Sequence, residues 1–139
     1  MNTKKLVIAF VAVFFFVTFA NFVIHGILLQ PYYAQSPQLM RTAADGQAHA
    51  PFLMLAFFFF SLGFVWIFAQ GVSSRPWVGQ GVRYGAAIWL VTSVSQYIVY
   101  YAIQPWPASV VCMQIGLELI MNIVAGLIVA SIYRNPIRS

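Results

Sequence analysis

Charged side chains are scarce in this sequence. Its 139 residues include seven lysines and arginines and two acidic residues, so that 6% are charged, where about a quarter is usual for a soluble domain. So few charges cannot cover the surface of a water-exposed globule that is 62% hydrophobic and 17% aromatic. The same hydrophobicity excludes a disordered chain. The class of protein that remains is an integral membrane protein.

Several signatures of chemistry are also absent. Cys112 is the single cysteine, which excludes a disulfide framework and dithiol chemistry. Paired carboxylates, a serine triad and a glycine-rich phosphate loop are not present, so we predict that the chain is not an enzyme. We expect no cofactor, although the composition leaves room for bound lipid. The basic residues are scattered singly, which argues against a nucleic-acid partner.

Four apolar segments are long enough to cross about 30 Å of hydrocarbon at about 1.5 Å per helical residue. Because a backbone in lipid must satisfy its own hydrogen bonds, these segments are predicted to be helices. The expected fold is an all-α bundle of four transmembrane helices, forming a single domain over residues 1–139. The predicted helices cover residues 6–29, 51–69, 84–103 and 108–133, and the longest loop covers residues 30–50.

The positions of the cations predict an orientation. If the chain crosses the membrane four times, six of the seven basic residues fall on the side that also holds both termini, and Arg41 alone falls on the other side. Cytoplasmic loops carry the excess of lysine and arginine. We therefore expect both termini in the cytoplasm, with the chain in a bacterial inner membrane. The six residues are Lys4, Lys5, Arg75, Arg83, Arg134 and Arg138.

Glu118 is the most unusual residue, because it lies well inside the fourth apolar segment. A carboxylate at the membrane centre costs about 2.5 to 3.5 kcal/mol on insertion scales, so it should face protein or a water-filled cavity. Polar residues recur around it at helical spacing, every four residues in the fourth segment and on one face of the first. We predict a polar cluster between helices 1, 3 and 4 that consists of Glu118, Gln114, Asn122, Asn21, His25 and Gln96.

Two interpretations of this cluster remain open. In the first, buried amides and a protonated Glu118 tie three helices together. In the second, Glu118 binds a proton or a cationic solute, and His25 relays protons toward the outer surface. Our leading hypothesis is an accessory or structural subunit, whose partners are membrane lipids, other membrane subunits or further copies of itself. The alternative is a proton-coupled transporter of a small solute that uses Glu118.

Two further patterns carry predictions. Small residues at Gly81, Gly85, Gly126 and Ala130 permit close helix packing, either within the bundle or between copies. Imidazole, thioether and thiol groups near the outer side would suit copper, but no ligand spacing supports a site. Copper handling is therefore a weaker alternative, with His25, His49, Met40, Cys112 and Met113 as the candidate ligands.

Overall fold

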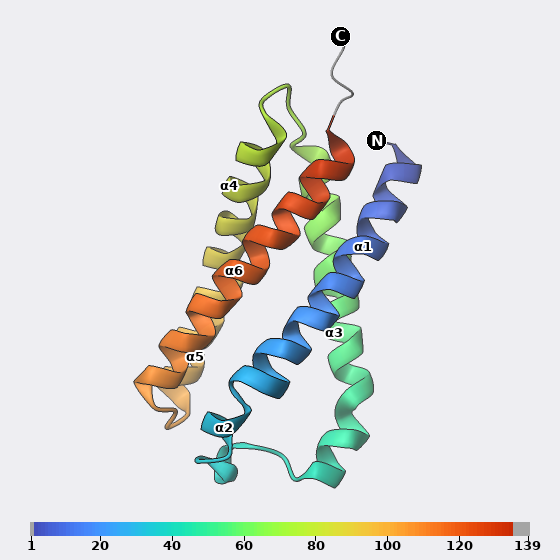
Figure 1. Cartoon of the computed structure of the whole chain (residues 1–139). Coiled ribbons are helices and arrows are strands. Elements are labelled where there is room, and N and C mark those ends of the chain that lie inside the picture. The colour runs from blue at the N-terminus through green and yellow to red at the C-terminus, as the bar shows by residue number, and fades with distance from the viewer. Residues whose placement is uncertain (1, 135–139) are drawn as a thin grey trace.

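The computed structural model describes residues 2–134, and the secondary structure of these residues is entirely helical (Figure 1). Within these residues, four helices are long and apolar enough to cross a membrane, which confirms the predicted all-α fold and the predicted number of long apolar helices. The first consists of α1 (Thr3–Asn21) and the π-helix η1 (Phe22–Leu28), and the third of α4 (Trp77–Trp89), the π-helix η3 (Leu90–Val94) and α5 (Ser95–Ile103). The second is α3 (Ala43–Gln70) and the fourth is α6 (Ala108–Tyr133), while α2 (Gln30–Tyr33) and the 3₁₀ turn η2 (Pro37–Leu39) lie between the first two.

Helix α3 begins well before the predicted segment 51–69, and the predicted loop 30–50 is correspondingly shorter. The side chain of Thr42 accepts a hydrogen bond from the backbone N–H of Asp45 at 3.3 Å, which caps the helix at Ala43. Pro51 lies inside α3 without ending it, although an interior proline removes one helical hydrogen bond and clashes with the carbonyl of the preceding turn. The polar first turns were missed because hydropathy alone marks only the apolar part of a helix.

The helices pack as two antiparallel hairpins, α1 with α3 and α4–α5 with α6, and α1 also packs on α6 (Figure 1). One end of the bundle, here called the terminal end, holds the start of α1, the end of α6 and the α3–α4 connection. The other, the α2 end, holds α2 and the turn before α6. The buried apolar core runs between α1, α3 and α6 and includes Ala9, Val13, Val17, Phe64, Val65, Ala125 and Val129.

The two ends differ in charge. Lysines and arginines at the terminal end come from the starts of α1 and α4, the α3–α4 connection and the end of α6, whereas Arg41 is at the α2 end. Arg138, which belongs to the predicted basic set, lies outside the described residues. Arg41 donates to Asp45 at 2.7 Å, so the α2 end has little net charge.

Glycines bring α4 and α6 into close contact. A Cβ atom added at Gly81 would lie 2.7 Å from the carbonyl oxygen of Gly126, and one added at Gly85 would lie 2.3 Å from that of Asn122. Ala130, one turn further along α6, is 1% exposed. In this chain the small residues therefore pack within the bundle. Helix α4 begins at Trp77, earlier than the predicted start of this segment at residue 84.

Candidate functional site

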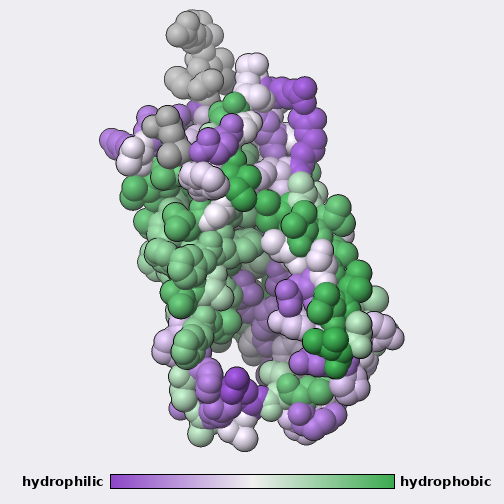
Figure 2. All heavy atoms as spheres, turned by 180° about the vertical axis from the view of Figure 1, so that it is seen from behind, coloured by the Kyte–Doolittle hydropathy of each residue, from purple (hydrophilic) through white to green (hydrophobic). Residues whose placement is uncertain are grey.

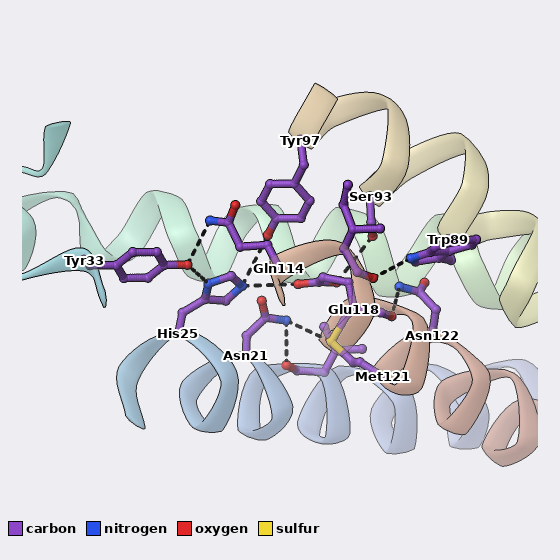
Figure 3. A network of polar contacts seen from close by, with 12 residues as sticks. Asn21, His25, Tyr33, Trp89, Ser93, Tyr97, Gln114, Glu118, Met121 and Asn122 are labelled. Carbon is purple, nitrogen blue, oxygen red and sulfur yellow. Dashed lines mark hydrogen bonds and ion pairs between the residues drawn. The ribbon is translucent and has the colours of Figure 1, made fainter. Parts of the chain in front are cut away.

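The carboxyl group of Glu118 lies inside the bundle and contacts two of the other helices (Figure 3). The residue is 6% exposed. Its Oε1 atom lies 3.2 Å from Nε2 of His25, and its Oε2 atom accepts a hydrogen bond from the hydroxyl of Ser93 at 3.4 Å. The hydroxyl of Tyr97 lies 3.4 Å from the same His25 nitrogen. Three helices thus meet at one buried acid.

A chain of hydrogen bonds runs from Glu118 toward the α2 end (Figure 3). The side-chain amide of Gln114 donates to the hydroxyl oxygen of Tyr33 at 3.0 Å, and this hydroxyl lies 2.6 Å from Nδ1 of His25. Burial raises the pKa of the Tyr33 phenol above its ordinary value of 10.0, so the hydroxyl is protonated at neutral pH and can donate to Nδ1. In the tautomer of His25 that accepts this hydrogen bond, the Nε2 atom carries the imidazole proton and donates to Glu118.

Both π-helical segments supply a residue to this site. His25 belongs to η1 and Ser93 belongs to η3. A π turn inserts one extra residue into an α-helix, which rotates the residues that follow by about 100°. Such turns occur frequently at functional sites. The two distortions lie on either side of Glu118, where they aim His25 and Ser93 at the carboxylate.

Glu118 also lines a cavity of about 670 Å³. The space-filling view shows a hollow in the half of the molecule toward the α2 end, with hydrophilic side chains on its floor and hydrophobic columns on either side (Figure 2). The cavity opens between α3 and the η3–α5 segment. Its walls are largely aromatic and aliphatic, and its lining includes Phe57, Phe60, Tyr97, Tyr100, Asn21 and Glu118.

Two further cavities reach His25 from other directions. One, of about 690 Å³, lies between α1–η1 and α3 and is lined mostly by apolar side chains. The other, here called the vestibule, has a volume of about 380 Å³ and is formed at the α2 end by residues that include Gln30, Tyr33, Arg41 and Thr42. His25 therefore lies between the polar vestibule and the cavity that holds Glu118.

The structure brings together some of the predicted cluster but not all of it. Glu118, Gln114 and His25 form one network. The amide of Asn122 donates to the backbone carbonyl of Glu118 at 2.9 Å, one turn earlier in α6. The amide of Asn21 donates to the carbonyl of Val17 at 2.9 Å and lies 3.3 Å from the sulfur of Met121. Asn21 thus borders the network without joining it.

Gln96 was wrongly placed in the network. It is exposed and lies in the lining of the cavity, whereas Ser93 and Tyr97 contact the His25–Glu118 pair. Sequence reasoning missed these two residues because it assumed a regular α-helix through η3. Tyr33 was likewise not predicted as part of the site, because it lies outside the apolar segment that contains His25.

The candidate copper ligands do not gather into one site. Within residues 2–134, no three histidine, cysteine or acidic side chains are close enough to hold a metal ion together. His49 pairs with Asp45 at 3.1 Å, on the exposed first turns of α3, and Cys112 is exposed on α6. His25 is committed to Glu118 and Tyr33. Met40 lines the vestibule, while Met113 packs against the core.

Replacing Tyr33 by phenylalanine should lower stability at neutral pH by about 1 to 3 kcal/mol, because it leaves the Gln114 amide and His25 Nδ1 without their partner. The folded state holds the Tyr33 proton more tightly than the unfolded state, so this residue stabilises the fold fully below its unfolded pKa of about 10 and progressively less above it. The difference in unfolding midpoint between the two proteins should therefore shrink as the pH rises above about 10. A difference that stays constant over this range would contradict the assignment.

Comparison with known proteins finds no relative: no protein-family model, curated protein or solved structure matches this chain. The functional proposal rests on the side chains and cavities described above.

Proposed function

We propose that this chain is a membrane protein that binds and carries a small amphipathic cation, exchanging it for a proton at Glu118. The observation that supports this proposal is a buried carboxyl group, that of Glu118, which lines a cavity between α3 and the η3–α5 segment. A carboxylate needed only to tie helices together would be enclosed by side chains. The carboxyl group of Glu118 instead lines a cavity, where a ligand can reach it.

The lining of the cavity favours a cation with an apolar body. No lysine or arginine is among the residues that line it, so Glu118 sets its charge. Phe57, Phe60, Tyr97 and Tyr100 provide aromatic surface, and aromatic faces attract cations. The volume of about 670 Å³ lies in the range of about 300 to 1,000 Å³ that is usual for small-molecule sites.

The hydrogen-bond chain supports a role for protons. Tyr33 lines the vestibule, and its hydroxyl can pass its proton to Nδ1 of His25 while it regains one from the vestibule. His25 in turn passes the Nε2 proton to Glu118. The net result is one proton delivered to the carboxylate, which loses its charge and releases the cation. In the reverse direction a bound cation displaces the proton.

The proposed setting is a bacterial inner membrane with both termini in the cytoplasm. The four apolar helices and the excess of cations at the terminal end support this orientation. It places the vestibule toward the outer surface. The close contact of α4 with α6 and the buried apolar core between α1, α3 and α6 lie between Glu118 and the terminal end. Transport would therefore require a second conformation, in which we expect the π-helical segments η1 and η3 to change.

Starting from the form in which the Glu118 carboxyl group is protonated, binding of benzyltrimethylammonium to the detergent-purified protein should release about one proton per cation. This ligand has no proton of its own to lose, so the proton must come from the protein. The measurement is calorimetric titration in two buffers that differ in ionisation enthalpy. Neopentylbenzene, which has the same shape without the charge, is the control and should release none. Cation binding with no proton release would contradict the exchange.

The second candidate remains an accessory subunit of a membrane complex. One observation favours it, because Phe15, Phe19 and Phe22 follow one face of the first helix and are each more than 60% exposed. An aromatic stripe of this kind suits either lipid or the helix of a partner. If the chain is an accessory subunit, Glu118 only stabilises the fold, and its charge is not required for assembly with a partner.

A further inference from the structure

A cavity lined by cationic side chains lies at the terminal end, about 20 Å along α6 from Glu118. Its volume is about 220 Å³, and it lies between the end of α6 and the start of α4. Arg75 and Arg134 both line it, together with Tyr133. An adjoining cavity shares Arg75 and extends to Arg83. Three arginines from different parts of the chain therefore surround one small region.

These arginines have no acidic side chain to pair with. The whole sequence contains two acidic residues, Asp45 and Glu118. Asp45 pairs with Arg41 and His49, and Glu118 pairs with His25. The positive charge of the cavity is thus not balanced by any Asp or Glu of this chain, which favours an anion from outside it.

Two further features point to an anionic ligand. Tyr133 is 8% exposed, and within residues 2–134 its hydroxyl has no hydrogen-bond partner, which is costly for a buried polar group. Helix α4 begins at the cavity with Trp77, and the N–H groups of a first helical turn carry partial positive charge.

The loop at the cavity is held in place by its own hydrogen bonds. The side chain of Gln80 accepts from the backbone N–H of Ser73 at 3.1 Å and donates to the carbonyl of the same residue at 3.0 Å. The backbone N–H of Arg75 lies 3.4 Å from the Ser73 hydroxyl oxygen. Arg75 is therefore presented on a loop that hydrogen bonds hold in place before any ligand arrives.

We propose that this cavity binds a phosphate ester. The guanidinium groups of Arg75 and Arg134 and the start of α4 would hold the phosphate oxygens, and the Tyr133 hydroxyl would donate to one of them. Two sources share this chemistry, the headgroup of an anionic phospholipid and a soluble organic phosphate. Basic pockets between helix ends on the cytoplasmic side are known to bind lipid headgroups, and the apolar Phe68 and Val72 in the same lining could contact the glycerol part.

The test is a lipid titration of the detergent-purified full chain by native mass spectrometry, with phosphatidylglycerol and phosphatidylcholine as probes. Phosphatidylglycerol should bind more tightly. The double variant Arg75→Gln/Arg134→Gln should bind it about 25-fold more weakly, because each basic residue near an anionic headgroup contributes a factor of about five. Tyr133→Phe should weaken binding about tenfold, since it removes a hydrogen bond to a charged group.

The double variant Lys4→Gln/Lys5→Gln is the matched control. It removes the same charge from the same end of the bundle but outside the cavity, and should lose much less affinity. Glycerol 3-phosphate distinguishes the sources: if it competes with the lipid at similar concentration, the ligand is a soluble phosphate ester, and if it does not, the ligand is the lipid. Equal losses in the lysine and arginine variants, or equal binding of both lipids together with no binding of glycerol 3-phosphate, would overturn the proposal.

Discussion

Glu118→Gln is expected to lower the affinity for benzyltrimethylammonium by about two to three orders of magnitude and to abolish the proton release that accompanies binding. Two unit charges about 4 Å apart attract by about 4 kcal/mol at an effective dielectric constant of about 20, and every 1.4 kcal/mol is about a tenfold change in affinity. Glutamine keeps the shape and hydrogen bonding of the side chain but not its charge. Calorimetric titration over a range of pH measures both effects.

The chain offers a well-matched control for this variant. Asp45 is the other acidic residue of the sequence, and it lies on the surface at the α2 end, paired with Arg41. Asp45→Asn removes the same charge and should leave cation binding unchanged. Glu118→Asp should keep proton release with weaker binding, because the charge is retained but the shorter side chain reaches less far toward the cation.

The variant Glu118→Gln also separates the two candidate functions. If Glu118→Gln binds the cation as tightly as the original protein while remaining folded, the carrier proposal fails. Retention of a membrane partner by this variant during extraction would then favour the accessory subunit, for which the buried polar network has only a structural role. Loss of cation binding with unchanged unfolding behaviour supports the carrier.

Gly126→Ala is expected to destabilise the bundle by about 3 kcal/mol or more. The added Cβ atom would lie 2.2 Å from the carbonyl oxygen of Gly81, and a backbone atom cannot rotate away as a side chain can. Forcing extra volume into a packed interface costs typically about 1 to 3 kcal/mol, and occasionally more. Helix α6 would have to move away from α4, which would also disturb the position of Glu118 relative to Ser93. Reversible unfolding in mixed micelles measures the change.

Gly116→Ala provides the control on the same helix. A Cβ atom at this position meets nothing within 4 Å, and alanine is a better helix former than glycine by about 1 kcal/mol. This variant should be neutral or slightly more stable. If the two substitutions had the same effect, α4 and α6 would not be in the close contact described here, and the glycines would be free to pack between copies of the chain.

The sequence by itself determined the all-helical fold and the main elements of this protein. Hydrophobic length is a local property, so the four long apolar helices could be predicted from composition and spacing alone. Helical periodicity also predicted that Gln114 and Glu118 share a face, and the cost of placing a carboxylate among apolar residues predicted that Glu118 would be sheltered by polar partners such as His25.

Only the tertiary structure decided which other groups complete the site. The π-helix η3 rotates the residues that follow it, so Tyr97 faces the network where Gln96 was expected, and no periodicity in the sequence marks this extra residue. Tyr33 reaches His25 because the chain folds back after η1. Whether Glu118 would be enclosed or open to a cavity depended on how far α3 and α5 diverge. That divergence is set by packing between helices distant in sequence, which the local pattern of residues does not specify.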